Sequence, residues 1–435
     1  MSTKNITKYK KVSVLGLGYV GLPTAAIIAN KGLRVIGVDT NASTVKTINE
    51  GKTHIIEPDL EVLVRSAVNS KNLVASTIPE PADAFIIAVP TPFTTEKKPD
   101  LTFLQQAIES IAPVIKGENL IILESTSPVG TTQKVAEWLS NVRQDIEFSE
   151  LDNIATIDSK NIYIAHSPER VLPGRVLLEL VNNDRVIGGL TEQCGNEAES
   201  LYRLFVKGNC HVTNARTAEL VKLTENAYRD TNIAFANEIS LVCDKLDIDV
   251  WELIKLANRH PRVDILKPGP GVGGHCIAVD PWFIVDSAPD ETPLIRASRF
   301  VNDNKPTWIV QKILNTIDEN ATLACLGLTY KSDIDDLRES PSMAVIEELA
   351  KCHKGQILLA DPNIESLPDS LRKILNIKFC DFEEAISRSE VIILLTDHRE
   401  FIEINKSILS NKTVFDTRGI WRSFLTRNNL ESVVD

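Results

Sequence analysis

The sequence predicts an α/β protein in which two doubly wound parallel-sheet domains are joined by a central helical region with one long helix. Three observations predict this fold. Short apolar runs alternate with helical segments in the first 200 residues, a weaker form of this pattern returns after residue 305, and a long segment without Gly or Pro lies between them. Because 435 residues exceed the size of one core, we expect domains at 1–210, 211–305 and 306–435.

The first domain begins with a βαβ pattern. Residues 12–17 form an apolar run with a glycine near its end, residues 24–29 have helical composition, and residues 34–38 form a second apolar run. Further strands are expected at 84–89 and 120–124, and the chain between them is long enough for helical crossovers. These features favour an open parallel sheet.

The middle of the chain reads as helix. Residues 214–246 contain neither Gly nor Pro, and apolar residues such as Leu220 and Phe235 predict burial on more than one side. A second helix is expected at 250–258. The segment 267–276, KPGPGVGGHC, has Gly or Pro at six of ten positions, which predicts a sharp change of chain direction.

The last domain repeats the first in weaker form. Three apolar runs have counterparts near the N-terminus, namely 323–328 with 12–17, 356–363 with 34–41, and 391–396 with 86–91. The repeat lacks the glycine motif of the first domain. We therefore expect it to bind a different ligand.

Composition excludes several classes of protein. The chain is 43% hydrophobic and carries 47 Lys and Arg against 59 Asp and Glu, a formal charge of −12, which argues against non-specific binding to nucleic acid or acidic membranes. Seven cysteines without CxxC spacing predict free thiols, and neither they nor the seven histidines have the spacing of a metal site. The polar N-terminus and short apolar runs predict a cytoplasmic protein without a membrane span.

A glycine motif indicates a nucleotide site. Gly16, Gly18 and Gly21 follow one predicted strand, and Asp39 closes the next, 18 residues after the last glycine. In a Rossmann-like domain such glycines permit a tight turn, close approach of a pyrophosphate and helix packing, while the carboxylate binds a ribose. The carboxylate would repel a 2′-phosphate and so favours NAD over NADP. The alternative is a glycine turn without a ligand.

Cys276 stands apart from the other cysteines, which fit ordinary apolar or surface patterns. Small residues precede it, and Asp280 follows four residues later, one helical turn away. A thiol and a carboxylate in a dinucleotide-binding protein indicate hydride transfer through a covalent thiohemiacetal, which permits two successive oxidations. The neighbouring His275 is expected to have a packing or loop role, because adjacent side chains in a turn usually point apart.

Lys222 and Asn226 share one face of the predicted long helix. On an exposed helix such a pair is ordinary. If the helix is buried, these polar groups need partners, and the lysine could stabilise a developing alkoxide while the asparagine positions water or substrate.

Eight motifs in order resemble the UDP-glucose/GDP-mannose dehydrogenase family along nearly the whole chain. They are GLGYVGLP, EPDL, VPTP, ESTSPVG, SPER, KLTEN, GVGGHCIAVDP and YKSDIDDLRES. The resemblance implies an N-terminal NAD-binding domain, a central region whose long helix forms a homodimer, and a C-terminal UDP-binding domain. It also implies the four-electron oxidation of a sugar C6 alcohol to a carboxylate with two NAD.

The resemblance implies roles for individual residues. The implied catalytic set is Cys276 as nucleophile, Lys222 as oxyanion stabiliser, Asp280 with a water for proton transfer and hydrolysis, Asn226 for substrate positioning, Thr126 for holding water, and Glu169 as general acid or base. Implied cofactor contacts are Gly16, Gly18, Tyr19, Val20, Gly21, Asp39, Thr91, Thr126 and Arg338. Implied substrate contacts are Glu169, Arg170, Val171, Lys222, Asn226, Arg262, Gly273, Lys331 and Arg418.

Departures from the family pattern bear on the substrate. UDP-glucose enzymes typically read GGSC and PEFLAEG, whereas this chain has GGHC and PERVLPG. These variants resemble the branch that acts on N-acetylated sugars. The expected substrate is therefore a UDP-N-acetylated hexosamine, with UDP-N-acetyl-D-mannosamine favoured, UDP-N-acetyl-D-glucosamine as the alternative, and bacterial surface polysaccharide as the destination. A nucleotide-sugar-binding protein without catalysis and a two-electron alcohol dehydrogenase remain as other readings.

Overall fold

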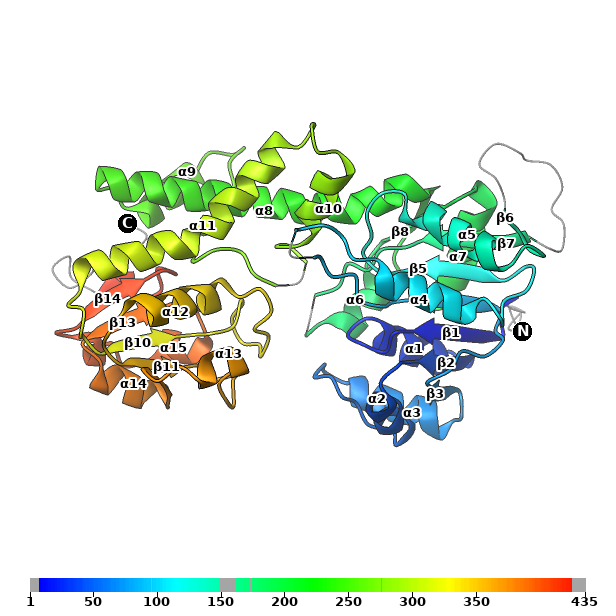
Figure 1. Cartoon of the computed structure of the whole chain (residues 1–435), viewed down its shortest axis with the longest axis horizontal. Helices are drawn as coiled ribbons and strands as arrows, with labels where there is room; N and C mark the ends of the chain where they lie inside the picture. The colour runs from blue at the N-terminus through cyan, green and yellow to red at the C-terminus, as the bar shows by residue number, and fades with distance from the viewer. Residues whose placement is uncertain (1–7, 95, 149–160, 173, 275, 425–435) are drawn as a thin grey trace. The chain divides into compact units, whose positions relative to one another are not determined.

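The computed structural model describes residues 8–94, 96–148, 161–172, 174–274 and 276–424. They form two compact units (Figure 1). Unit 1 runs up to Thr224 and also includes Trp282–Pro289, and unit 2 consists of Glu225–Pro281 together with the residues from Asp290 onward. Each unit contains a sheet covered by helices, so the predicted α/β class is confirmed.

The sheet of unit 1 has the order β3-β2-β1-β4-β5-β7-β8-β9, and β6 pairs with β7. All pairs are parallel except β7 with β8. The strands are β1 (Lys11–Leu15), β2 (Arg34–Val38), β3 (Leu73–Ser76), β4 (Ala84–Ile87), β5 (Leu120–Leu123), β6 (Glu147–Phe148), β7 (Asn161–His166), β8 (Arg185–Gly189) and β9 (Cys210–Asn214). The strand order proceeds from β1 to β2 and β3 on one side and from β4 to β5 on the other, which places a switch point between β1 and β4.

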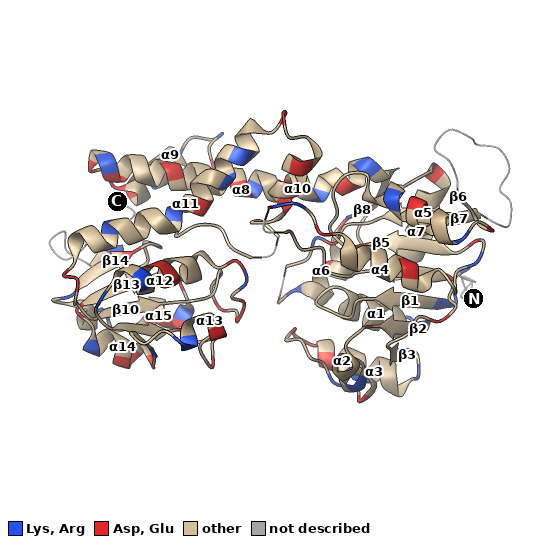
Figure 2. Ribbon diagram, in the orientation of Figure 1, with Lys and Arg blue, Asp and Glu red and all other residues tan. Residues whose placement is uncertain are grey.

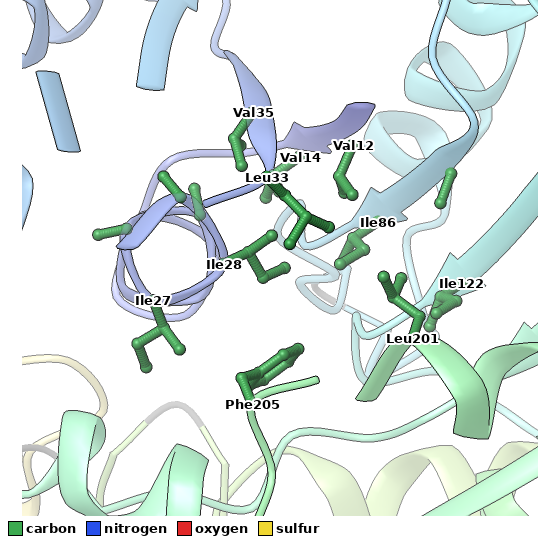
Figure 3. Close-up of a cluster of buried hydrophobic side chains, with 14 of the residues drawn as sticks. Val12, Val14, Ile27, Ile28, Leu33, Val35, Ile86, Ile122, Leu201 and Phe205 are labelled. Atoms are coloured by element: carbon green, nitrogen blue, oxygen red, sulfur yellow. The ribbon is translucent and has the colours of Figure 1, made fainter. Parts of the chain in front are cut away.

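Helices cover both faces of this sheet because side chains alternate along each buried strand. The helices are α1 (Gly21–Asn30), α2 (Ala42–Asn49), α3 (Leu60–Asn69), α4 (Thr102–Ile111), α5 (Thr131–Val142), α6 (Val176–Asn182) and α7 (Glu192–Tyr202). Figure 3 shows one face, where Ile28 of α1 lies on the side of the helix toward Val12 and Val14 of β1. The other face packs Leu15 and its neighbours against α4 and α5.

Unit 2 contains a five-stranded parallel sheet of order β12-β11-β10-β13-β14. Its strands are β10 (Leu323–Leu326), β11 (Ile357–Ala360), β12 (Ile377–Phe379), β13 (Val391–Leu394) and β14 (Thr413–Asp416). The helices after β10 are α12 (Pro341–Cys352), α13 (Asp369–Arg372), α14 (Phe382–Arg388) and α15 (Arg399–Glu403), with 3₁₀ turns at Lys406–Leu409 and Arg422–Phe424.

The helical region consists of α8 (Ala215–Leu246), α9 (Val250–Ala257), α10 (Asp280–Ser287) and α11 (Pro293–Thr316). The predicted long helix is present as α8. Leu220 and Phe235, expected to be buried, are 40% and 53% exposed, because α8 presents part of its apolar surface outward. The helix α11 continues through Pro306, so the boundary predicted at 305 lies inside a helix.

The two sheets repeat one local arrangement, as the sequence echo indicated. In unit 1 the Leu17 N–H donates to Asp39 Oδ2 at 3.0 Å, and in unit 2 the Leu328 N–H donates to Asp361 Oδ2 at 2.6 Å. The carboxylates differ in their surroundings. Asp39 is partly exposed, whereas Asp361 is 6% exposed and has His398 Nε2 3.1 Å from its Oδ2.

Charged side chains of both signs are interspersed along the helices of each unit (Figure 2). The excess of acidic residues is therefore spread among basic residues rather than gathered on one helix. None of the helices in the described part of the chain combines the length and apolar character that crossing a bilayer requires.

Candidate active site

The glycine turn of unit 1 is built for a close backbone approach. Gly16 has φ +87°, its N–H donates to Val38 O at 2.8 Å, and a Cβ added to it would lie 2.6 Å from Ala88 O. A Cβ on Gly21 would lie 1.8 Å from Gly16 O. Gly18 faces open space, since a Cβ there would meet nothing within 4 Å. The turn thus has two packed glycines and one open one, which fits a pyrophosphate at the start of α1.

The remaining predicted cofactor residues of unit 1 lie on the loops around this turn. Asp39 accepts the N–H groups of Leu17 and Asn41, at 3.0 and 2.9 Å, and remains partly exposed at the end of β2. Tyr19 is 39% exposed, and Val20 is the N-cap residue of α1. Asp39 is thereby held in place with capacity left for a ribose hydroxyl.

A hydrogen bond joins the loops that follow β4 and β5. The hydroxyl of Thr91 donates to the carbonyl oxygen of Thr126 at 2.6 Å. The second loop is also held by Ser125, whose hydroxyl donates to Val89 O at 2.7 Å. Two residues predicted to contact the cofactor are therefore brought together at the carboxyl ends of neighbouring parallel strands.

Glu219, which sequence reasoning missed, anchors the start of α5 to α8. Its carboxylate accepts the N–H of Gly130, and the N–H and hydroxyl of Thr132, each at 2.6 Å. The residue is 1% exposed, and burial raises the pKa of Glu219 although these donors act in the opposite direction. The sequence feature that could have indicated this buried residue is a glutamate flanked by apolar residues on a predicted helix.

Lys222, one turn beyond Glu219, donates from Nζ to the hydroxyl of Thr126. The structure thus places the predicted oxyanion donor against the threonine predicted to hold water. His166 lies near enough for the charge of Lys222 to matter. Burial, aided by Lys222, lowers the pKa of His166 to about 3, so the imidazole is neutral.

Glu169 is held from two sides. Its Oε2 accepts Arg185 Nη2 at 2.9 Å, and its Oε1 accepts the Arg170 N–H at 2.6 Å. Arg185 also lies 3.4 Å from Glu124 Oε1. The glutamate is 6% exposed, so its carboxylate points into unit 1. Arg185 and Glu124 were not predicted as site residues.

The two neighbours of Glu169 in the predicted substrate set point elsewhere. The Arg170 guanidinium donates to Asp184 O, and Val171 packs against the hydrophobic core of unit 1. The side chain of Val171 is thus partly buried by this packing. The loop is held by Glu57, whose carboxylate accepts the N–H groups of Gly174 and Val176 at 2.8 and 2.7 Å.

In unit 2 the chain turns at Cys276. The carbonyl oxygen of Cys276 accepts the N–H groups of Val279 and Asp280 at 3.1 and 2.8 Å, so one turn joins the thiol-bearing residue to the carboxylate-bearing residue. Asp280 is 2% exposed, and its Oδ2 accepts Asn226 Nδ2 at 2.6 Å. The structure brings these three predicted residues together. His275 lies outside the described residues.

The glycines before Cys276 allow close packing on Tyr330. Gly274 has φ +83°, and a Cβ there would lie 2.9 Å from the Tyr330 ring, while a Cβ on Gly273 would lie 2.5 Å from Tyr330 Cβ. The Gly274 N–H donates to Arg338 O at 3.0 Å. Gly273 therefore has a steric role, and the backbone of Arg338, predicted to contact the cofactor, holds this loop.

Three predicted cations of unit 2 differ in their setting. Arg418 donates from Nε to Asp397 at 2.9 Å, and its guanidinium lies 2.5 Å from a Cβ added to Gly269, so it borders the glycine-rich loop. Lys331 is exposed and follows β10. Arg262 is exposed in the segment after α9. Of the three, Arg418 is the one that lies against the loop that carries Cys276.

Family models match three successive parts of the chain. Residues 10–206 match the NAD binding domain, residues 216–304 the central domain, and residues 324–423 the UDP binding domain of the UDP-glucose/GDP-mannose dehydrogenase family. The chain belongs to this family. The resemblance read from the eight motifs is confirmed.

Individual family members agree over nearly the full length. A UDP-N-acetyl-D-mannosamine dehydrogenase from Campylobacter jejuni is 55% identical over 402 residues, covering 92% of this chain and 98% of the relative. An NDP-N-acetyl-D-galactosaminuronic acid dehydrogenase from Ralstonia nicotianae is 51% identical over 415 residues, covering 95% and 96%. The solved UDP-D-ManNAc dehydrogenase from Pyrococcus horikoshii is 38% identical with TM-score 0.85, covering 97% and 99%.

Proposed function

We propose that the chain catalyses the NAD-dependent, four-electron oxidation of the C6 alcohol of UDP-N-acetyl-D-mannosamine to UDP-N-acetyl-D-mannosaminuronate. The observation that carries this proposal is the turn that joins Cys276 to Asp280, whose buried carboxylate accepts a hydrogen bond from the Asn226 amide. The 55% identity to a relative named for this substrate supports the choice of sugar.

The residues of unit 1 fit NAD. The open position at Gly18 leaves room for a pyrophosphate, and the charge of Asp39 disfavours a 2′-phosphate. NAD, when bound, accepts one hydride in each of the two oxidations. Tyr19 lies in the glycine turn, and Thr91 and Thr126 lie on the loops after β4 and β5. These three residues would complete the cofactor site.

In the first oxidation the C6 hydroxyl loses a proton and the carbon loses a hydride, which gives an aldehyde. Lys222, already a donor to the Thr126 hydroxyl, would stabilise the developing alkoxide. The thiolate of Cys276 then forms a C–S bond to the aldehyde carbon, which gives a thiohemiacetal. Loss of a second hydride from that carbon and of the hydroxyl proton leaves a thioester.

Hydrolysis completes the reaction. Water attacks the thioester carbon, the C–S bond breaks, the thiol is restored and a carboxylate is released. Asp280 would accept the proton of this water, and Asn226 would keep the carboxylate in position. One sugar, two NAD and one water therefore yield one uronate, two NADH and three protons.

The decisive experiment supplies NAD with UDP-N-acetyl-D-mannosamine, UDP-N-acetyl-D-glucosamine, UDP-N-acetyl-D-galactosamine and UDP-glucose in separate assays. NADH and the acid product are both measured. We expect the highest kcat/KM with the mannosamine and two NADH per sugar. The galactosamine is included because of the 51% identical relative. A higher kcat/KM for another sugar would reject the substrate, and one NADH per sugar would reject the covalent double oxidation.

The outward face of α8 supports a homodimer. Tyr228, Phe235 and Val242 are spaced by seven residues and are 68%, 53% and 45% exposed. Seven-residue spacing keeps side chains on one helix face, and exposed apolar stripes of this kind are typical of helix–helix interfaces. We infer that two copies pair through this stripe. Seven cysteines without CxxC spacing support a cytoplasmic location.

A further inference from the structure

Arg185 lies at the centre of a buried group of charges in unit 1. It comes from β8 and is 5% exposed, and it bridges Glu169, from the loop after β7, and Glu124, which follows β5. Two carboxyl groups from different loops therefore share one guanidinium. The distances, 2.9 Å to Glu169 and 3.4 Å to Glu124, make Glu169 the closer partner.

Glu124 has a second donor on one oxygen and none on the other. Its Oε1 accepts the hydroxyl of Tyr202 at 2.7 Å, and the Tyr202 ring lies 4.6 Å beneath the Arg185 guanidinium. Its Oε2 is buried and has no hydrogen-bond partner among the described residues. A fully ionised carboxylate needs donors on both oxygens, so this environment accommodates a protonated Glu124.

The buried position of Glu124 favours its protonation near neutrality. Burial is the largest effect and raises the pKa of Glu124 to about 7, with the charge of Glu169 adding to it and Arg185, Tyr202 and Lys222 opposing it. Burial lowers the pKa of Arg185, but Glu169, Tyr202 and Glu124 outweigh it, so the guanidinium stays charged. The pKa of His166 is lowered to about 3, which leaves it neutral. Glu124 is thus the group that titrates in this cluster around pH 7.

We propose that Arg185 is a positioning residue for Glu169, and that Glu124 is a second carboxyl group that competes with Glu169 for the same guanidinium. When Glu124 is protonated, Glu169 is the single anionic partner of Arg185. When Glu124 loses its proton to solvent, the guanidinium is shared and Glu169 is held less firmly. This inference rests on the proposed role of Glu169 and adds a control on its position.

The first test measures the proton directly. Infrared difference spectra between pH 6 and pH 8, recorded on the full chain without substrate, report the carbonyl stretch of protonated carboxyl groups. Exposed carboxyl groups are already ionised in this window. We expect one protonated carboxyl band that disappears with a midpoint near pH 7. Glu124→Gln should abolish it, and Glu137→Gln, an exposed change on α5, should leave it intact.

A second variant tests the assignment even if Glu124→Gln fails to fold. Tyr202→Phe removes a hydrogen bond that favours the ionised form of Glu124 while keeping the ring under Arg185. The infrared midpoint should therefore move to higher pH. A band that survives in Glu124→Gln, or a midpoint in Tyr202→Phe that is unchanged or lower, would overturn the assignment to Glu124.

The kinetic test asks whether this proton controls the reaction. In the wild type, kcat/KM for the nucleotide sugar should show an ionisation near pH 7 that is absent in Glu124→Gln and displaced upward in Tyr202→Phe. Arg185→Lys cannot bridge two carboxyl groups, so kcat should fall about tenfold or more while the KM for NAD stays constant. Retention of the kinetic ionisation in Glu124→Gln, or of full kcat in Arg185→Lys, would reject the proposal.

Failure of the proposed function gives a different pattern. Glu169→Gln is expected to lower kcat strongly at every pH. If Glu169→Gln is fully active, the role of Glu169 is wrong, whatever the infrared result. If Glu169→Gln is inactive but Glu124→Gln keeps the wild-type pH profile, the role of Glu169 stands and the competition for Arg185 is wrong.

Discussion

Asn226 and Asp280 are joined by a hydrogen bond of 2.6 Å, from the side-chain amide on α8 to the buried carboxylate at the start of α10. Asp280 is 2% exposed and follows the turn that begins at Cys276. An amide is a neutral donor, so it orients the carboxylate without cancelling its charge. The hydrogen bond therefore sets the direction of the carboxylate.

Asn226→Ala should lower kcat about 10- to 100-fold, the loss expected when a hydrogen bond to a charged group of 1.5 to 3 kcal/mol is removed. The KM for NAD should stay within experimental error, because Asn226 belongs to unit 2 and the glycine turn belongs to unit 1. Steady-state kinetics check this. Asn232→Ala, on the same helix with a bond to Tyr228 O, is the control, and an equal loss there would contradict the assignment.

Cys276→Ala should abolish formation of the acid while NAD binding survives. The thiol is the one group proposed to form a covalent bond with the sugar, and the glycine turn lies in the other unit. Product analysis and NAD titration measure the two effects. Cys352→Ala, an exposed cysteine on α12, should be fully active. Net uronate production by Cys276→Ala would exclude the thioester.

Glu219→Ala should destabilise unit 1 by about 2 to 4 kcal/mol, because three donors at the start of α5 lose their acceptor. The thermal midpoint should fall, and kcat should fall with it, since the same loop carries Thr126. Differential scanning calorimetry and kinetics provide both readouts. Glu238→Ala, an exposed change on α8, should alter neither, so comparable losses from the two variants would argue against the anchor.

Lys305 makes stability rise with pH. It is 1% exposed on α11, donates to Ser240 at 2.7 Å and lies 4.2 Å over the Trp308 ring. Burial lowers the pKa of Lys305 to about 7. Between pH 7 and 10.5 the unfolded chain binds the extra proton, so the free energy of unfolding increases with pH in this window.

Lys305→Met should remove this dependence. Between pH 7 and 9 the wild type should gain on the order of 1 to 3 kcal/mol relative to the variant. Denaturant unfolding at several pH values measures the difference. Lys351→Met, an exposed lysine on α12, should keep the wild-type slope. Parallel curves for Lys305→Met and the wild type would show that the buried amine does not titrate there.

Phe235→Asp should separate the proposed homodimer, because it places a charge in the apolar stripe of α8 at a position that is 53% exposed in the single chain. Sedimentation equilibrium should then give the monomer mass with an unchanged far-ultraviolet spectrum. Glu238→Lys changes charge on the same helix next to the stripe and tests for a general charge effect. A dimer that persists in Phe235→Asp would place the interface elsewhere.

The sheets and the long helix were predictable because their signals are local. Apolar runs of four to six residues separated by crossover-length segments define parallel strands, and β2 was predicted to the residue. The turn from Cys276 to Asp280 also followed from a spacing of four. The domain boundary at 305 stays a prediction, since local signals did not show that α11 continues through Pro306.

The supporting residues of the site were beyond sequence reasoning because their contacts are long-range. Glu219 meets Thr132 across 87 residues and Arg185 meets Glu124 across 61. Neither contact is indicated by a hydrophobic period or by a motif in a single sequence. The same holds for the packing of the Val171 side chain against the core of unit 1.

The contrast between Asp39 and Asp361 has a consequence for ligand choice. Asp361 accepts N–H groups from Leu328, Thr329 and Asn363 and also meets the buried His398. Because Asp361 is only 6% exposed, a sugar hydroxyl has little access to its carboxylate. Of the two similar strand–turn–strand segments, the first thus has a carboxylate that a ribose hydroxyl can reach, and the second has a buried one. We therefore expect an adenine dinucleotide to bind at the first sheet and not at the second.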